Sequence, residues 1–112
     1  MNLAIRTVDH VTILELAGRL DAGSTPPVAE ALRKLTAAAP AHVVVNLSGV
    51  NFMDSTALAA LVQGLKRARQ VDGNVRLCNI QQPVRIIFEL TRLEKAFDIY
   101  ASELDAVKAF GA

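Results

Sequence analysis

Three consecutive oxygen-bearing residues, Asp54, Ser55 and Thr56, are the strongest candidates for chemistry in this chain. They follow an apolar segment and precede a helical stripe, so they lie at a predicted helix N-terminus. Residues of these types cap a helix by accepting hydrogen bonds from its free backbone N–H groups, which is worth about 1 kcal/mol. The same N-terminus also favours a phosphate, which would add about −1.5 to −2 charges. The residues alone are therefore compatible with a structural cap and with a phosphoacceptor.

A serine nucleophile at Ser55 is not favoured by the rest of the chain. Ser55 does not stand in the Gly-x-Ser-x-Gly sequence of a nucleophile elbow. The two histidines that could act as its base are His10 and His42. His10 lies in a predicted hairpin turn, and His42 begins the strand that leads to Ser55, at the opposite end of that strand. We therefore expect no catalytic activity.

Cofactor and metal sites are not indicated either. The histidines and the single cysteine, Cys78, lack the spacing of a zinc site, and Cys78 is expected to be a small core residue. Asp21 can approach Asp54 across the predicted fold, but two carboxylates without a third ligand do not make a metal site. The glycine-rich loops of nucleotide sites are also missing from the sequence. We expect neither a cofactor nor a metal.

Composition indicates a small soluble protein of the cytoplasm. The 112 residues suit one domain, and 52% of them are hydrophobic. A formal net charge of +1 provides no general attraction to nucleic acid or to an anionic membrane. One cysteine fits a reducing compartment, and the N-terminus does not have the pattern of a signal peptide. No stretch approaches the roughly 20 apolar residues that cross a bilayer, so we expect no direct membrane insertion.

The spacing of apolar residues predicts strands that alternate with helices after an opening hairpin. This order, β-β-α-β-α-β-α-β-α, favours an α/β fold with a mixed, mostly parallel sheet of about five strands and about four helices. The continuous valines of the third strand predict a central position, and the basic residues 66, 67 and 69 predict a solvated helix face. The expected strands span residues 3–8, 11–17, 42–47, 75–78 and 97–100. The expected helices begin near residues 24–25, 54–55, 83 and 102. The first is expected to end near Ala38, and the third to carry Leu93. The last is expected to carry Leu104 and Phe110 on its apolar face.

The sequence resembles the STAS domain family of anti-sigma factor antagonists. Val44–Thr56, with the sequence VVNLSGVNFMDST, is similar to the family's strand and phosphorylation motif, and Gly18–Asp21, with the sequence GRLD, is similar to the end of its second strand. The element order extends the resemblance over nearly the whole chain. It implies one STAS domain spanning residues 1–112.

The resemblance implies a partner-switching protein that is not itself an enzyme. In the family, the unphosphorylated antagonist binds an anti-sigma factor with a GHKL-type serine kinase fold, and this releases a sigma factor. The kinase phosphorylates the antagonist, and a PP2C-type phosphatase removes the phosphate. The motif places the acceptor at Ser55, with Thr56 as second choice, and a partner surface at Asp21, Asp54, Ser55, Thr56 and Ala57.

One departure from the family pattern favours an alternative function. Ala57 and Ala59 stand where the family usually has glycine. Some STAS proteins are assembly modules of sensory complexes or of ABC lipid transporters, in which the same region is an interface without phosphorylation. The two alanines give this alternative slight support, and the phosphorylated antagonist remains the leading prediction.

Overall fold

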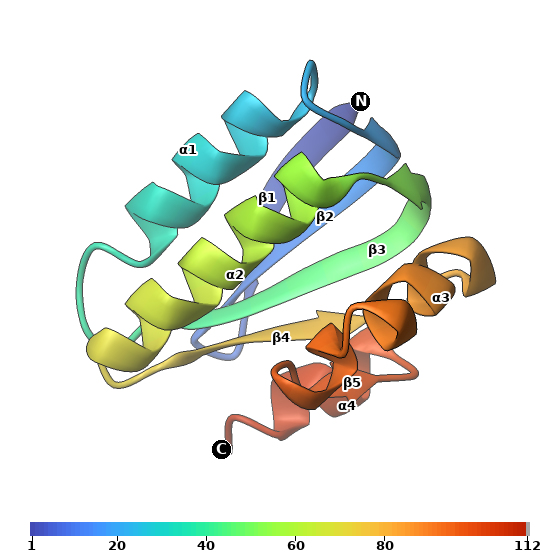
Figure 1. The fold of residues 1–112 in the computed structure, drawn as a ribbon. Coiled ribbons are helices and arrows are strands. Elements are labelled where there is room, and N and C mark those ends of the chain that lie inside the picture. Colours follow the sequence, from blue (N-terminus) through green and yellow to red (C-terminus); the bar gives the residue numbers. More distant parts are fainter. Residues whose placement is uncertain (112) are drawn as a thin grey trace.

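Five strands form one mixed sheet in the order β1-β2-β3-β4-β5 (Figure 1). The computed structural model describes residues 1–111. β1 and β2 are antiparallel, and the other neighbouring pairs are parallel. The strands are β1 Asn2–Val8, β2 Val11–Leu20, β3 His42–Met53, β4 Asn74–Cys78 and β5 Ile99–Tyr100, and the helices are α1 Thr25–Leu35, α2 Ser55–Gln70, α3 Gln82–Leu90, the 3-10 turn η1 Leu93–Lys95, and α4 Glu103–Lys108. The predicted fold class and element order are confirmed.

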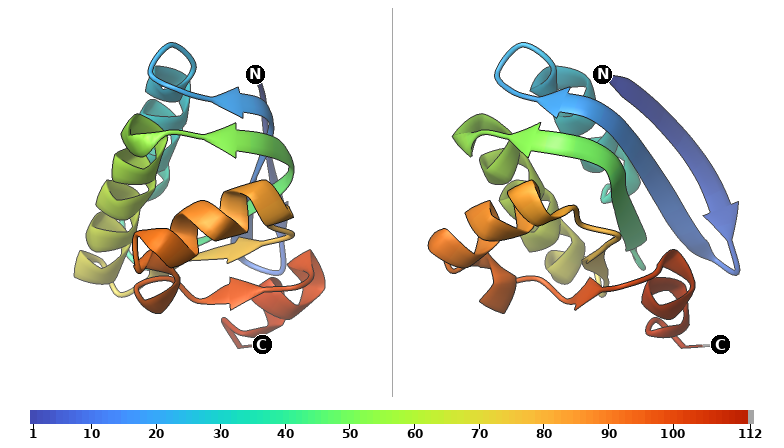
Figure 2. Two further views of the ribbon diagram at one scale, coloured as in Figure 1. Left: turned by 45° about the vertical axis from the view of Figure 1, so that its right-hand side comes forward. Right: turned by 90° about the vertical axis from the view of Figure 1, so that its right-hand side faces the viewer.

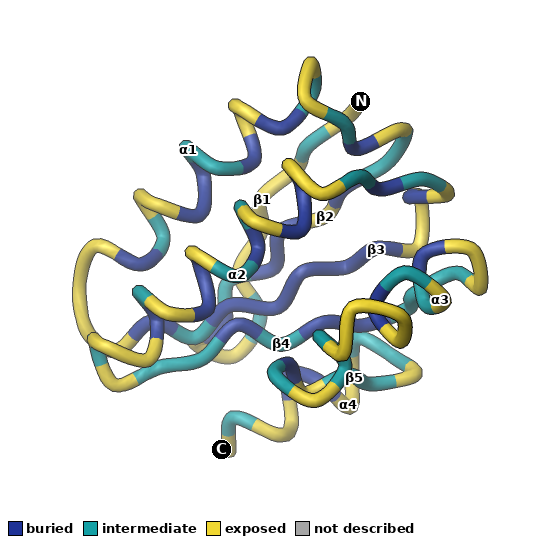
Figure 3. Tube along the Cα trace, viewed as in Figure 1, coloured by how far each residue is buried: buried dark blue, intermediate teal, exposed yellow. Residues whose placement is uncertain are grey.

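The sheet is covered on both faces, but unequally. Helices α1, α2 and α3 lie on one face, and α4 lies on the other (Figure 2). The larger core takes Val43, Val45 and Leu47 from β3, whereas Val44 points into the smaller core beneath α4. β3 is therefore buried along most of its first half (Figure 3), which confirms its predicted central position.

The opening hairpin turns at Asp9 and His10. Both residues have positive φ angles, 47° and 69°, and Val8 pairs with Val11 across them. Two central residues with positive φ are typical of a type I′ turn, whose twist matches the right-handed twist of the strands it joins. The predicted hairpin is thus confirmed.

Two strands are longer than predicted. β2 continues to Leu20 and β3 to Met53 through segments that were expected to be loops. Irregular pairing joins the extensions, with Gly18 opposite Val50 and Leu20 opposite Met53. Residues 48–51 are polar or glycine apart from the buried Val50, so the local sequence is typical of a turn. Pairing across the sheet, with bulges that absorb the irregular residues, determines the strand instead.

Four smaller predictions need correction, three about helices and one about the last strand. α1 ends at Leu35 instead of Ala38, and α3 ends at Leu90. Leu93 lies in the separate turn η1, because Arg92 has a φ of 63° that stops the helix. The last strand is only two residues long. Leu104, expected on the apolar face of α4, is 60% exposed, because α4 packs through Ala106 and Val107.

Candidate functional site

The predicted site lies where β2 and β3 end, at the carboxyl edge of the sheet (Figure 1). Ligands of open α/β sheets bind at this edge because the loops after neighbouring parallel strands meet there. Here the loop after β2 and the start of α2 are joined directly. The N–H of Asp54 donates to the Leu20 carbonyl at 3.0 Å, and the N–H of Ala22 donates to Asp54 Oδ2 at 3.1 Å. The expected proximity of the Asp21 loop to Asp54 is therefore confirmed.

Asp54 is the cap of α2. Its backbone is extended, and its Oδ1 accepts a hydrogen bond from the N–H of Ala57 at 3.1 Å. Its other carboxylate oxygen is occupied by the N–H of Ala22 from the neighbouring loop. One side chain thus fixes both the start of the helix and the position of the loop beside it. Of the two caps that the sequence allowed, Asp54 and Ser55, the structure has Asp54.

Asp21 organises the loop before α1. Its Oδ1 accepts hydrogen bonds from the N–H of Gly23 at 3.1 Å and from the N–H of Ser24 at 3.2 Å, and the Ser24 hydroxyl oxygen lies 3.2 Å from it. Partial burial acts to raise the pKa of Asp21, but these hydrogen bonds and the charge of Arg19 outweigh it and lower that pKa. Asp21 is therefore a carboxylate at neutral pH. Its Oδ2 lies 3.7 Å from Nε of Arg19.

α1 begins at the predicted position, but without a side-chain cap. Ser24 occupies the N-cap position, but its hydroxyl makes no capping hydrogen bond. It donates instead to the Arg19 carbonyl at 2.7 Å and accepts from the N–H of Asp21 at 3.0 Å. Its role is to close the loop rather than to satisfy the helix.

Ser55 and Thr56 are the first two residues of α2, and both are exposed. Within residues 1–111, neither hydroxyl takes part in a hydrogen bond that holds the fold. The first backbone N–H groups of a helix also have no partner inside it. An exposed hydroxyl therefore stands beside free N–H groups at the positive end of a 16-residue helix.

Ala57 does not belong to the exposed surface. Its side chain is 3% exposed and packs in the core with Leu58 and Leu61. Its methyl group therefore adds little to the exposed surface, and its place among the partner-binding residues stays a prediction. Ala59, in contrast, is exposed.

An aromatic and cationic pair that the sequence pattern did not predict lies beside the site. The guanidinium carbon of Arg19 lies 3.8 Å from the centre of the Phe52 ring, and Arg19 pairs with Phe52 in the sheet register. Both residues stand in the strand extensions that were predicted as loops. The signal that could have found them is that Arg19 and Phe52 occupy equivalent positions in two neighbouring strands.

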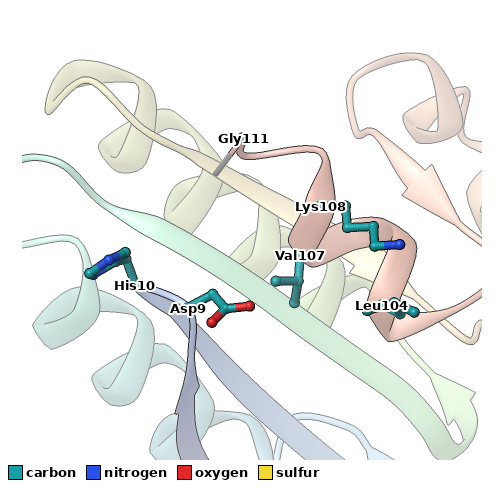
Figure 4. Close-up of a pocket in the computed structure, with 6 residues that line it drawn as sticks. All are labelled: Asp9, His10, Leu104, Val107, Lys108 and Gly111. Carbon is teal, nitrogen blue, oxygen red and sulfur yellow. The ribbon is translucent and has the colours of Figure 1, made fainter.

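The histidines that could act as a base for Ser55 lie far from it, and the described residues gather no metal-binding cluster. His10 and Asp9 line a pocket of about 430 Å³ between the β1–β2 turn and α4 (Figure 4). β2 has 10 residues, so this turn is separated from the site by about 30 Å of strand. His42 begins β3 and stacks on Phe110 at 4.7 Å. Between residues 1 and 111, no three His, Cys, Asp or Glu side chains gather in a way that could hold a metal.

Cys78 is a buried core residue, as predicted. Burial, with a smaller contribution from the charge of Glu103, raises the pKa of its thiol to about 12. It is therefore not a nucleophile at neutral pH. In the same described part of the chain, no helix has the length and apolar character to span a membrane.

Comparison with known proteins places the chain in a family. The STAS domain model matches residues 2–106, so the chain belongs to the STAS domain family. The anti-sigma-B factor antagonist of Staphylococcus epidermidis is 33% identical over 96 residues, which are 84% of this chain and 89% of the relative. The anti-sigma F factor antagonist of Paenibacillus polymyxa is 30% identical over 113 residues, covering 96% and 94% of the two chains.

Solved structures show the same fold. An anti-sigma-factor antagonist (STAS) domain protein from Planctomyces limnophilus superposes with a TM-score of 0.90 at 22% identity, over 98% of each chain. The Bacillus cell fate determinant SpoIIAA in its phosphorylated form gives a TM-score of 0.74 at 19% identity, over 97% of this chain and 99% of that one. The resemblance inferred from the two sequence motifs is thereby confirmed at the level of family and fold.

Proposed function

We propose that this protein is an anti-sigma factor antagonist of the cytoplasm, whose unphosphorylated form binds an anti-sigma factor and so releases a sigma factor. Support comes from relatives of that name that are at least 30% identical and are matched over most of their length. The chain acts as a binding protein and as a substrate, not as an enzyme.

Phosphorylation of Ser55 is the proposed switch. The observation that carries it is the exposed hydroxyl of Ser55 at the first position of α2, with the capping role already filled by Asp54. A kinase can therefore reach and modify Ser55 without removing a hydrogen bond that the fold needs. A helix N-terminus tolerates the product, because its N–H groups and dipole favour a phosphate.

The added charge changes the surface that a partner meets. The carboxylates of Asp21 and Asp54 already lie at this end of the sheet, and phosphate adds about −1.5 to −2 charges beside them. A partner surface that accommodates two carboxylates and a neutral hydroxyl is then faced with crowding and excess negative charge. Binding weakens while the fold beneath stays the same.

The proposed partners follow from the family resemblance. The kinase is the anti-sigma factor itself, with a GHKL-type serine kinase fold and ATP as phosphate donor. A PP2C-type phosphatase reverses the reaction. The ester forms between the Ser55 oxygen and the γ-phosphorus of ATP, ADP leaves, and the hydroxyl proton is released.

Mass mapping after incubation with the cognate kinase and ATP tests the acceptor. The expected result is one phosphate on Ser55, none on the Ser55→Ala variant, and unchanged phosphorylation of the Thr56→Ala control. Phosphate on Thr56, or on neither residue, refutes the assignment. In a binding assay, Ser55→Ala should keep its affinity for the anti-sigma factor and Ser55→Asp should lose it; equal binding by both excludes the switch.

The alternative, a STAS assembly module, makes the opposite prediction of no phosphorylation. The sequence supports this alternative through Ala57 and Ala59, which stand where the family usually has glycine. Since Ala57 is buried, its methyl group does not obstruct a kinase, and half of that support is lost. The neighbouring genes discriminate further, because a kinase and a sigma factor accompany an antagonist, whereas a permease and an ATPase accompany a transporter module.

A further inference from the structure

Among residues 1–111, β1 is an edge strand with an unoccupied outer side. It pairs with β2 through all seven of its residues, and in Figure 2 it is the outermost strand, with the helices away from its outer edge. The opposite edge of the sheet is the two-residue strand β5. A long open edge is a template for another strand, because its outer N–H and C=O groups lack partners.

The hairpin geometry identifies which backbone groups are free. In a two-residue hairpin the residues flanking the turn, here Val8 and Val11, form a hydrogen-bonded pair. Such pairs alternate along an antiparallel ladder, so the next residues to bond with β2 are the even-numbered ones. The odd-numbered residues Leu3, Ile5 and Thr7 therefore direct their N–H and C=O groups outward.

The usual protections of an edge are missing from Asn2–Val8. The segment contains no proline, lysine or acidic residue, and its pairing with β2 runs without a register shift. Its one charge, Arg6, is held on the far face of the sheet by ion pairs with Glu15 and Glu103. In the middle of the strand Ile5 is 50% exposed, which leaves an apolar side chain beside free backbone groups.

We propose that β1 pairs with β1 of a second copy of this chain, antiparallel and centred on Ile5. In this register Ile5 lies opposite Ile5, and Leu3 lies opposite Thr7, so every outward group meets an outward group and about six hydrogen bonds form. Arg6 lies opposite Ala4, so no like charges are directly opposed. In this register the side chains, charges and free backbone groups of β1 all match those of a second β1. A second copy of this chain is therefore the partner expected at this edge.

The pairing is independent of the proposed switch and is compatible with it. A two-fold axis at Ile5 reverses the direction of the second sheet, so the two Ser55 sites lie at opposite ends of a ten-stranded sheet formed from two five-stranded ones. Each site remains accessible, and the dimer presents two separate partner surfaces.

Sedimentation of the native chain over a range of concentrations is the first test. The expected result is a reversible monomer–dimer equilibrium. Ile5→Lys places two cations opposite each other at the axis and should raise the dissociation constant by at least about tenfold. The matched control is Leu104→Lys, at a residue that is 60% exposed on α4, and it should leave the equilibrium unchanged. An equimolar mixture of Ile5→Lys and Ile5→Glu should recover the dimer.

Cross-linking tests the register. Cys78 is buried and provides no background, so a short bismaleimide should link Ile5→Cys chains into dimers. Ala4→Cys, whose side chain points to the other face and lies opposite residue 6, should link poorly. A native monomer up to the solubility limit overturns the proposal. So does a dimer that survives Ile5→Lys, or one that cross-links equally well from both positions.

Discussion

Replacing Asp54 with alanine tests whether its carboxylate holds both the start of α2 and the neighbouring loop. Its Oδ1 caps α2 through the N–H of Ala57, and its Oδ2 holds the N–H of Ala22 in the neighbouring loop, each at 3.1 Å. Loss of an N-cap costs about 1 kcal/mol, and loss of the second hydrogen bond, which is exposed to solvent, costs about 1 kcal/mol more. The Asp54→Ala variant should therefore lose about 2 kcal/mol of stability.

Thermal and urea unfolding measure this loss. For a chain of 112 residues, an unfolding entropy of about 2.1 cal/mol/K per residue converts 1 kcal/mol into roughly 4 °C. We expect the melting temperature of Asp54→Ala to fall by about 8 °C. Asp54→Asn keeps one carbonyl oxygen for the cap but offers an amide group to the second N–H. It should lose about half as much.

The control is Thr56→Ala, two residues further along. The Thr56 side chain is exposed and has no hydrogen bond in the described fold, so the change should stay within about 0.5 kcal/mol of native. If Asp54→Ala is no less stable than Thr56→Ala, the double role of the carboxylate is wrong. If Asp54→Asn is as damaging as Asp54→Ala, the hydrogen bond to the loop outweighs the cap.

Three further outcomes follow from the packing. The pKa of Glu103 lies below its ordinary value of 4.5, chiefly because Arg6 donates a hydrogen bond to it, so its contribution to stability is present above that value and is lost as the pH falls. Glu103→Gln should thus be less stable than native at pH 7 and approach it in acid; a pH-independent difference contradicts this. Because burial raises the pKa of Cys78 to about 12, its thiol should resist alkylation at neutral pH until urea unfolds the chain, and rapid alkylation of the native form would disprove that burial. A Cβ on Gly49 would lie 2.6 Å from the Cβ of its β2 neighbour, so Gly49→Ala should cost about 1–3 kcal/mol in urea unfolding. Gly23→Ala, whose Cβ meets nothing closer than 3.5 Å, should cost much less, and similar costs for the two would argue against the close approach.

The element order and the meeting of the Asp21 loop with Asp54 could be predicted because both depend on local patterns. Apolar runs at strand spacing and stripes at helix spacing specify the alternation. Parallel neighbours then bring the residues that follow β2 and β3 to one edge. Asp54 also has the residue type of a helix cap, so its position and its partner within the helix follow from the sequence.

The strand extensions could not be predicted because their cause is not local. Ser48 and Gly49 have the composition of a turn. They remain in β3 because Gly49 pairs with Ala17 of β2, while Ser48 falls in the irregular part of the register. The pair Arg19 and Phe52 was lost with the same segments. The burial of Ala57, in contrast, was predictable, since it stands four residues before the core residue Leu61 on the same helical stripe.

In the structure, Asp54 has the capping role that the sequence allowed for the triplet Asp54, Ser55 and Thr56. Asp54 uses both carboxylate oxygens to hold the fold, and the hydroxyl of the adjacent Ser55 remains outside the hydrogen bonds that do so. Under the proposed function, a phosphate on Ser55 gains about 0.3–1 kcal/mol from the dipole of α2 and meets like-charge repulsion from the adjacent Asp54. These effects oppose each other, so the free energy of folding changes little while the surface charge changes by about −1.5 to −2. A switch arranged in this way acts on partner binding and leaves the antagonist folded in both states, which is what repeated phosphorylation and dephosphorylation requires.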